Sequence, residues 1–348
     1  MKIIIIGAAG MVGRKLTTAL LEAGSLSGRG ITELDLVDVI APETSDAAGI
    51  EVKATAADIS DPAVASRLIE NRPDVIFHLA AIVSGEAELD FDKGYAINLD
   101  GTRHLFEAIR KAGAQTPYCP RFVFTSSIAV FGAPFPDKIG DEFFQTPRTS
   151  YGTQKAIGEL LLSDYSRRGF LDGVGIRLPT ICIRPGKPNK AASGFFSSIL
   201  REPLVGQEAV LPVDADVRHW HASPRSAVGF LIHAAEMDTA ELGARRNLNM
   251  PGLSATVAEQ IEALRRVAGD KAVGLIRHEP DPMITEIVSG WARDFDASRA
   301  ISLGFKAETS FDDIIRIHID DELGGTTPLD VMITFPEAKA EEAPPPTS

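Results

Sequence analysis

The chain opens on a β-branched apolar run that leads directly into three evenly spaced glycines. Ile3–Ile6 predict a strand buried on both faces. Gly7, Gly10 and Gly13 follow, and apolar residues then recur at helical spacing from Leu16 onward. This order of strand, tight turn and helix directs the helix N-terminus at whatever lies above the strand. Such an end suits a pyrophosphate, because its unpaired N–H groups and the helix dipole both favour negative charge.

Each of the three glycines has its own physical reason in such a turn. Gly7 permits the turn, Gly10 lets phosphates approach the backbone, and Gly13 lets the helix and the strand pack closely. The spacing is GxxGxxG rather than the GxGxxG of the commonest dinucleotide fingerprint. The motif therefore indicates a nucleotide site, and the alternative is a small-residue turn in some other doubly wound protein.

The composition excludes several classes of protein. Of the 348 residues, 44% are hydrophobic and 24% are charged, which is typical of a globular enzyme. A net charge of −13 argues against nucleic-acid binding, which needs a concentrated basic face. No apolar run approaches the roughly 20 residues that cross a bilayer. No signal peptide is visible, and Cys119 and Cys182 are too few for a disulfide framework. We expect a cytoplasmic protein that binds neither membrane nor nucleic acid and has no metal site.

Strand-like runs alternate with amphipathic stretches through the first half of the chain. The runs are Ile3–Ile6, Leu34–Val39, Val52–Ala56, Val75–Leu79, Phe122–Ser126 and Val174–Leu178, and the stretches are Asp61–Asn71, Asn98–Ala112 and Tyr151–Arg168. This alternation predicts a parallel sheet with helices on both faces, an α/β fold of the Rossmann-type doubly wound class.

After about Pro179 the alternation loosens, and we expect a smaller, mixed C-terminal substrate-binding region. Helical patterns recur there at 224–237 and 256–268. We therefore expect a cofactor-binding domain over residues 1–178 and a substrate-binding region over 179–324, some elements of which return to the first domain. Residues 325–348 are rich in Pro, Ala and Glu, and we expect them to form a flexible tail.

Two acidic residues follow predicted strands and bear on the choice of dinucleotide. Asp38 ends the second long run, at a distance from the glycines that the segment SLSGRG (25–30) lengthens. A carboxylate here would accept hydrogen bonds from the adenosine ribose and repel a 2′-phosphate, and no basic residue follows closely, so we expect NAD rather than NADP. The alternative is a turn or cap aspartate. Asp58 could reach the adenine amino group or cap the helix that begins near Asp61.

The chemical centre is predicted where TSS (125–127) ends a strand and YGTQK (151–155) follows. Tyr151 and Lys155 are four residues apart, so they share one face of a helix. A phenol is a poor base at neutral pH, but an ammonium beside it, with an oxidised nicotinamide, would favour the phenolate. Tyr151 could then accept a proton from an alcohol, with a hydroxyl of the TSS run bonded to the same oxygen. An exposed lysine and a half-buried tyrosine are the alternative.

Taken in order, these motifs resemble the extended short-chain dehydrogenases/reductases, also called the NAD-dependent epimerase/dehydratase family. The resemblance covers roughly residues 1–320 and rests on GAAGMVG (7–13), Asp38, Asp58-Ile59, HLAA (78–81), NLDGT (98–102), TSS (125–127), and Tyr151 with Lys155. It implies NAD as the cofactor. The cofactor contacts implied are Gly7, Gly10, Met11, Val12, Gly13, Asp38, Asp58, Ile59, Leu79, Ala80, Ala81, Asn98, Tyr151, Lys155, Pro179, Thr180 and Ile181.

The resemblance also implies roles at the reacting centre. Ser127 aligns with the catalytic hydroxyl, and Tyr151 and Lys155 align with the base and its helper. Ser126 is a substrate contact or a substitute for Ser127. Asn98 supports the lysine through water, and the backbone from Pro179 lines the nicotinamide. Related enzymes dimerise through the helices matching 98–112 and 151–168, so a homodimer is expected.

Departures from the family pattern narrow the subclass. Dehydratases place Asp-Glu directly after the catalytic hydroxyl, whereas Ile128 and Ala129 follow Ser127 here, and Gln154 replaces the serine usual in nucleotide-sugar epimerases. The chain most resembles a branch that oxidises D-erythronate, a four-carbon sugar acid, at its C2 hydroxyl. L-Threonine 3-dehydrogenases, nucleotide-sugar 4-epimerases and non-catalytic NAD(P)-binding sensors remain alternatives.

A small anionic substrate needs local cations, because the net charge of the protein has the wrong sign. Two short segments after the expected nicotinamide site are basic, with Arg184, Lys187 and Lys190 in one and Arg218, His219 and His221 in the other. We expect Arg184 or Arg218 to bind the substrate carboxylate, since a guanidinium can do so bidentately. Surface ion pairing is the alternative for the arginines, and hydroxyl contact or packing are the alternatives for the histidines.

Overall fold

The central feature of the computed structural model is a seven-stranded parallel sheet. The structure describes residues 1–45, 47–186 and 192–327. In spatial order the strands are β12 (Asn247–Asn249), β8 (Asp172–Leu178), β7 (Arg121–Ser127), β6 (Val75–His78), β1 (Lys2–Ile6), β4 (Glu33–Asp38) and β5 (Glu51–Ala56). The first strand of the chain therefore lies inside the sheet, and later strands extend it on both sides.

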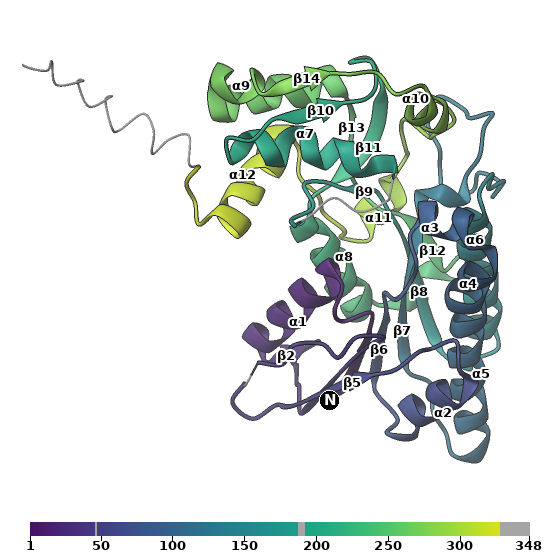
Figure 1. Cartoon of the computed structure of the whole chain (residues 1–348). Coiled ribbons are helices and arrows are strands. Elements are labelled where there is room, and N and C mark those ends of the chain that lie inside the picture. Colours follow the sequence, from purple (N-terminus) through teal and green to yellow (C-terminus); the bar gives the residue numbers. More distant parts are fainter. Residues whose placement is uncertain (46, 187–191, 328–348) are drawn as a thin grey trace, which may run out of the picture.

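Helices cover both faces of this sheet (Figure 1). One face carries α1 (Met11–Ala23) and α8 (Pro224–Glu236), and the other carries α2 (Pro62–Glu70), α5 (Thr102–Gln115) and α6 (Ser150–Arg167). Shorter elements connect them: the hairpin β2 (Ser25–Leu26) and β3 (Arg29–Gly30), α3 (Ser84–Leu89), α4 (Phe91–Gly94), the π-helix η1 (Tyr95–Gly101), and the 3₁₀ turns η2 (Ile128–Val130) and η4 (Thr239–Leu242).

A second region lies beyond the carboxyl ends of the strands, at the top of Figure 1, and has its own apolar core. Its strands are β9 (Thr180–Ile181), β11 (Arg218–Ala222) and β13 (Leu253–Thr256) in one sheet, and β10 (Ala209–Leu211) and β14 (Ile276–His278) in another. Its helices are η3 (Ala192–Gly194), α7 (Phe195–Leu204), α9 (Val257–Val273), α10 (Pro282–Ser289) and α12 (Phe311–Leu323). The short helix α11 (Ser298–Ser302) packs beside β12.

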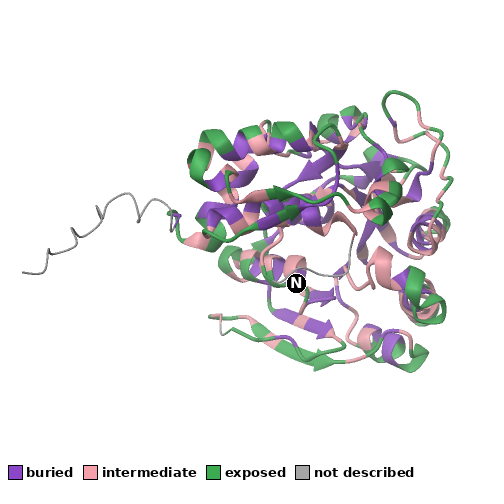
Figure 2. Ribbon diagram, turned by 45° about the horizontal axis from the view of Figure 1, so that its top comes forward, coloured by how far each residue is buried: buried purple, intermediate pink, exposed green. Residues whose placement is uncertain are grey.

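Burial explains why these segments fold as they do. Ile3–Ile6 are at most 1% exposed, because β1 is paired on both edges and covered on both faces. The edge strand β5 is mostly exposed, and its residues are more polar. Figure 2 shows the same division, with buried residues gathered in the strands and exposed ones on the outer faces of the helices.

The fold class predicted from the sequence is confirmed. The six predicted strands of the main sheet form within about two residues of their predicted ends, and the segment 25–30 forms the β2–β3 hairpin. The helix predicted over 256–268 is interrupted at Gly269, whose φ of 79° is not helical, and a further helical segment runs from there to Val273. The helix predicted from Asn98 begins inside a π-helix. After residue 179 the chain does return to the main sheet, through α8 and β12.

At the far end of the described chain, Gly325 and Thr326 are exposed and Thr327 is buried, and the flexible tail over 325–348 stays a prediction. Residues 328–348 lie outside the described residues. Within the part of the chain that the structure describes, no helix is both long enough and apolar enough to cross a membrane.

The turn after β1 leaves no room for a side chain at two of its three glycines. A Cβ on Gly13 would lie 2.2 Å from the Gly7 carbonyl oxygen, whereas one on Gly10 would meet that atom at 3.4 Å and nothing nearer. Gly13→Ala should therefore lower the free energy of unfolding by about 1–3 kcal/mol, the usual range for an overpacked site. Gly10→Ala is the matched control and should leave thermal stability close to that of the unsubstituted protein. Equal melting temperatures for the two variants would contradict this account of the packing.

Candidate active site

The glycine turn joins β1 to the exposed N-terminus of α1 at the carboxyl edge of the sheet. Gly7 adopts a φ of 97°, and a Cβ there would lie 2.6 Å from the Ala80 backbone nitrogen, so β1 and the chain after β6 pass in close contact. Gly10 is the N-cap of α1 and provides no side-chain cap. The first-turn N–H groups, including those of Met11 and Val12, therefore have no side-chain acceptor at the cap, which is the arrangement that suits a pyrophosphate.

Asp38 lies at the end of β4, beside this turn. Its Oδ2 accepts a hydrogen bond from the Ala9 N–H at 3.0 Å, and its Oδ1 accepts one from the Val39 N–H at 2.7 Å. The carboxylate is thus fixed against the glycine turn and does not cap a helix. Each oxygen keeps a lone pair for a further donor, as a ribose hydroxyl would require.

One basic residue near Asp38 was missed by the sequence analysis. Arg14, the residue after the last glycine, is exposed, and its guanidinium donates to the Ala9 carbonyl oxygen. Ala9 therefore carries Asp38 on its N–H and Arg14 on its oxygen. Arg14 precedes Asp38 in the chain, whereas the expectation of NAD rested on the residues that follow Asp38. A signal was present in the sequence, because a residue in the first turn of this helix must lie close to the turn itself.

Asp58 and Ile59 follow β5 and have different environments. Asp58 is exposed, and its Oδ1 accepts from the Ser60 N–H at 2.9 Å. The cap of α2 is Asp61, which accepts from the Ala63 N–H, so the helix-cap interpretation of Asp58 is wrong. Ile59 is buried against Gly101. Contact of Asp58 with adenine stays a prediction.

The segment after β6 is held by Asn98. Ala80 and Leu79 donate their N–H groups to the Ile6 carbonyl oxygen, which extends the pairing of β6 with β1. Asn98, which is buried in η1, accepts from the Ile82 N–H at 2.9 Å and donates to the Ile82 oxygen and, at 2.8 Å, to Gln154 Oε1. Its direct contacts are therefore with the backbone after Ala81 and with α6, and none is with the lysine.

The proposed reacting groups converge between β7 and α6. A hydrogen bond from Ser127 lowers the pKa of Tyr151, but burial is the larger effect and raises that pKa to about 12. Lys155 donates from Nζ to the Thr125 carbonyl oxygen at 2.8 Å, and the same atom lies 5.8 Å from the centre of the Tyr151 ring. Burial lowers the pKa of Lys155 to about 7. The three residues therefore form one cluster whose protonation a nearby charge can change.

The two serines at the end of β7 point in different directions. Ser126 is 2% exposed and donates to Glu159 Oε1 at 2.5 Å, on the side away from Tyr151. Ser127 is half-buried, accepts from the Ala129 N–H at 3.1 Å and bonds to Tyr151. Alternation along the strand separates the two hydroxyls, so Ser127 is the one that shares a site with the phenol.

The chain after β8 connects this cluster to the second region. Pro179 follows β8 directly, and Thr180 and Ile181 form β9, which pairs with β11. His219 Nδ1 lies 2.9 Å from the Ala292 oxygen and therefore carries the proton, and its Nε2 accepts from the Thr180 hydroxyl at 2.7 Å.

The two histidines of β11 are core residues of the second region. His219 is 4% exposed and His221 is 0% exposed. Burial lowers the pKa of His219 to about 4 and holds that of His221 well below its usual value, so both rings are neutral. Packing, and not contact with a substrate hydroxyl, is the alternative that the geometry supports for both.

The two candidate arginines have contrasting surroundings. Arg184 is half-buried, and its Nη2 donates to Ser193 Oγ at 3.1 Å, while no described carboxylate lies within ion-pair distance of it. Arg218 donates to the Ser254 oxygen at 2.9 Å and forms an ion pair with Glu259 at 3.2 Å. The surface ion-pair alternative therefore fits Arg218 and does not fit Arg184. Lys187 and Lys190 lie outside the described residues.

With this geometry in place, the chain can be compared with known proteins. The model of the NAD-dependent epimerase/dehydratase family matches residues 3–232. The chain belongs to this family. Two curated relatives within it are similar over nearly their whole length. D-erythronate dehydrogenase of Cupriavidus necator is 48% identical over 92% of this chain and 98% of its own. D-erythronate dehydrogenase of Haemophilus influenzae is 42% identical over 93% and 100%.

Solved structures give the same fold. A crystal structure described as a nucleoside-diphosphate-sugar epimerase from Agrobacterium tumefaciens is 70% identical, with a TM-score of 0.92 over 94% of this chain and 95% of that one. An L-threonine dehydrogenase from Cupriavidus necator is 23% identical, with a TM-score of 0.78 over 92% and 99%, and shows the fold alone. Membership of the NAD-dependent epimerase/dehydratase family confirms both the predicted family resemblance and NAD as the cofactor.

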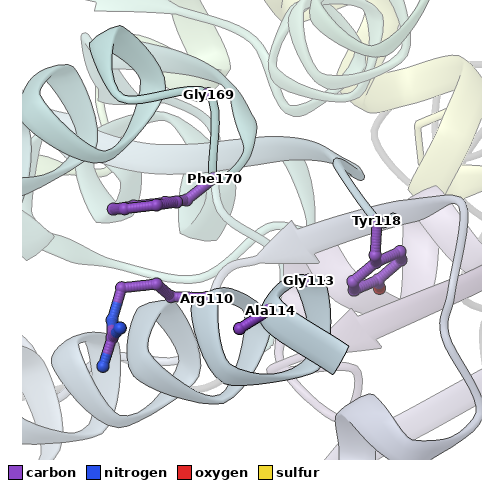
Figure 3. Close-up of a pocket in the computed structure, with 6 residues that line it drawn as sticks. All are labelled: Arg110, Gly113, Ala114, Tyr118, Gly169 and Phe170. Carbon is purple, nitrogen blue, oxygen red and sulfur yellow. The ribbon is translucent and has the colours of Figure 1, made fainter. Parts of the chain in front are cut away.

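Two further observations concern metal ligands and a pocket away from the reacting groups. Among the described residues, no group of three or more metal-ligating side chains could hold a metal ion. A pocket opens where the end of α5 faces the residues after α6, lined by Arg110, Tyr118, Phe170 and three small residues (Figure 3). It lies at the amino edge of the sheet, and Arg110 is paired with Glu107, so it is not a candidate for the active site.

Asp38 and Arg14 together make a specific prediction about the dinucleotide. Asp38→Ala should raise KM for NAD roughly 10- to 150-fold, because it removes hydrogen bonds from a charged group worth about 1.5–3 kcal/mol. It should also relax the rejection of NADP, since Arg14 then becomes the nearest charged group. Kinetics with both dinucleotides measure this, and the double variant Asp38→Ala/Arg14→Ala should lose the gained use of NADP. Equal use of NADP and NAD by the unsubstituted protein would show that Asp38 does not select the cofactor.

Proposed function

We propose that this protein is an NAD-dependent dehydrogenase that oxidises D-erythronate at its C2 hydroxyl to 2-dehydro-D-erythronate. One observation carries the proposal: the Ser127–Tyr151–Lys155 cluster lies at the same carboxyl edge of the sheet as the glycine turn, in a chain 42–48% identical to two D-erythronate dehydrogenases. The absence of an acidic residue after Ser127 argues against a dehydratase, because Ile128 and Ala129 cannot protonate a leaving hydroxide.

The residues at the sheet edge fit the cofactor of the family. The uncapped first turn of α1 and the open side of Gly10 would hold the pyrophosphate, and Asp38 would hold the adenosine ribose. The backbone of Leu79, Ala80 and Ala81 would pass beside the dinucleotide, and Pro179–Ile181 would line the nicotinamide. When bound, NAD supplies the acceptor for the hydride from C2 and a positive charge that favours the phenolate.

The protein's own groups then handle the proton. Tyr151, as the phenolate, accepts the proton of the C2 hydroxyl, and Ser127 holds that hydroxyl in place by a hydrogen bond. The Lys155 ammonium stabilises the phenolate across the 5.8 Å between its Nζ and the Tyr151 ring. The rate of oxidation should rise with pH as the phenol ionises, because burial keeps the phenol protonated in more acidic solution, and it should fall again once Lys155, whose pKa burial lowers, loses its proton.

Arg184 is the better candidate for the substrate carboxylate. It follows the segment that would line the nicotinamide by three residues, it is half-buried, and no described carboxylate neutralises it. A partly desolvated cation without an anionic partner favours an anionic ligand. Arg218, by contrast, is already engaged by Glu259.

We also propose a cytoplasmic homodimer. The two cysteines of the chain, Cys119 and Cys182, are both free thiols, which suits a reducing compartment. The outer face of α6 exposes Leu160 at 64%, and with α5 this helix offers the surface through which similar enzymes pair.

A nucleoside-diphosphate-sugar epimerase is the second candidate, because the 70% identical crystal structure carries that description. Incubation with NAD and D-erythronate, L-threonine or a UDP-hexose separates the candidates. Absorbance of reduced cofactor should rise with D-erythronate, and no epimer of the UDP-hexose should form. Conversion of the UDP-hexose without net reduction of NAD would favour the epimerase instead.

The role of Tyr151 as the base can be tested by removing its phenol oxygen. Tyr151→Phe should lower kcat by about 10²–10⁴-fold, the usual effect of losing a general base, while NAD affinity stays nearly unchanged because the ring still packs. Steady-state kinetics and a titration of NAD binding measure the two quantities. A variant that keeps more than about a tenth of kcat would rule out Tyr151 as the base.

The carboxylate site can be tested by comparing the two arginines. Arg184→Ala should raise KM for D-erythronate roughly 10- to 150-fold, as expected for losing a charge-assisted hydrogen bond of about 1.5–3 kcal/mol. Arg218→Ala is the control and should change that KM little, and neither should alter KM for NAD. An unchanged KM for D-erythronate in Arg184→Ala, or a larger rise in Arg218→Ala, would assign the carboxylate elsewhere.

A further inference from the structure

Helix α6 presents a third ionisable residue on the face that carries the reacting groups. Tyr151, Lys155 and Glu159 follow one another at intervals of four residues, so they lie along one face of the helix. Glu159 is 0% exposed and Lys155 is 2% exposed. The proposed proton transfer makes no use of Glu159, yet a carboxylate this deeply buried requires an explanation.

Both oxygens of Glu159 are held by donors from other elements. Oε1 accepts from the Ser126 hydroxyl at 2.5 Å and from Arg177 Nε at 3.0 Å. Oε2 accepts from Arg177 Nη2 at 2.8 Å and from the Gln145 side chain. This set of donors favours a carboxylate, and it fixes α6 to both β7 and β8.

Arg177 continues the network away from α6. Its Nη1 donates to Asn249 Oδ1 at 3.1 Å and lies 3.8 Å from Asp141 Oδ1, and Asp141 pairs in turn with Arg299 at 3.4 Å. Four alternating charges therefore run from the helix with the reacting groups, through β8, to α11. Arg177 is 4% exposed, so its ion pair with Glu159 is shielded from solvent.

The network lies directly behind the reacting cluster. Ser126 is the sheet neighbour of Arg177 and the chain neighbour of Ser127. Holding Ser126 therefore fixes the direction in which Ser127 faces Tyr151, because adjacent strand residues point to opposite faces.

Glu159 is a carboxylate on the same face of α6 as Lys155, one helical turn away. The titratable groups that face Lys155 are Tyr151 and Glu159 from α6 and His78 from β6, and β7 contributes the Thr125 carbonyl oxygen. Burial lowers the pKa of His78 to about 3, so its ring is neutral. Glu159 raises the pKa of Lys155 against the larger effect of burial.

We propose that Glu159, anchored by Arg177, is a positioning residue that keeps Lys155 as an ammonium and Ser127 turned toward Tyr151. The inference rests on the proposed function, in which Tyr151 is the base. Glu159 acts through Lys155, since it lies two helical steps of four residues from Tyr151, roughly 12 Å along the axis. Lys155 lies only one such step from each of them.

The test separates the charge of Glu159 from its packing. Glu159→Gln keeps the shape but removes the charge, so Lys155 loses its proton more readily and Tyr151 becomes harder to ionise. The acid limb of kcat against pH should move to higher pH by roughly one unit, a typical effect of one nearby charge. KM for NAD should stay unchanged. Glu159→Asp retains the charge and should keep the limb of the unsubstituted enzyme even if its melting temperature falls.

Asp172→Asn provides a matched control. Asp172 lies at the opposite end of β8 and is paired with Arg121 at 2.9 Å and Arg246 at 2.8 Å, so its loss also breaks a carboxylate held by two arginines. It should lower stability without moving the limb. If Glu159→Gln does not fold, Glu159→Gln/Arg177→Met removes both charges of the buried pair, and the same shift is expected from it.

A second readout needs no substrate. The phenolate absorbance of Tyr151 in the NAD complex is obtained by subtracting the titration of the same protein carrying Tyr151→Phe, and it should shift with the limb. If D-erythronate is not oxidised, the proposed function fails, but this titration still tests Glu159. An unshifted Tyr151 titration in Glu159→Gln, or an equal shift in Asp172→Asn, would overturn the proposal.

Discussion

The packing of α6 on β7 and β8 is the contact on which the rest of the structure depends. The helix can approach the sheet closely because two of its residues lack side chains: a Cβ on Gly152 would lie 2.2 Å from the Ala129 oxygen, and one on Gly158 would lie 2.7 Å from the Phe124 ring. The face thus brought against the strands carries Lys155 and Glu159 in place of apolar residues. Ionisable residues of the site therefore lie inside the interface between helix and sheet, so the geometry of the site and the stability of the fold cannot vary independently.

Much of this architecture could be predicted from the sequence because its signals are local. A strand buried on both faces is a continuous apolar run, as at Ile3–Ile6, and a helix on a sheet repeats its apolar residues every three or four positions. The glycine turn and the Tyr151–Lys155 spacing are local too. The π-helix that holds Asn98 was not predicted, since it differs from an α-helix by a hydrogen-bond shift that leaves little trace in the sequence.

The parts that sequence reasoning missed depend on contacts between distant segments. Arg218 had two interpretations, a contact with the substrate carboxylate or a surface ion pair, until the fold placed Glu259 beside it, 41 residues later in the chain. Ser126 was a substrate contact or a substitute for Ser127 in the sequence, and strand alternation turns it toward Glu159. The choice between Asp58 and Asp61 as the cap of α2 is instead a local one, and it is within the ordinary uncertainty of a helix start. In each case the residue type indicated a possible role, but the sequence did not reveal which group the residue contacts.

The order in which the sheet is completed has a consequence for synthesis of the protein. Strand β12, formed by Asn247–Asn249, pairs with β8, and α8 covers β7 and β8. Both elements come later in the chain than β9, β10 and β11 of the second region. A nascent chain that has left the ribosome only as far as residue 200 therefore carries β8 with an open edge and an uncovered apolar face. Such an edge can pair with a neighbouring chain. The speed at which about fifty further residues emerge thus sets how long the open edge of β8 can pair with other nascent chains made on the same mRNA.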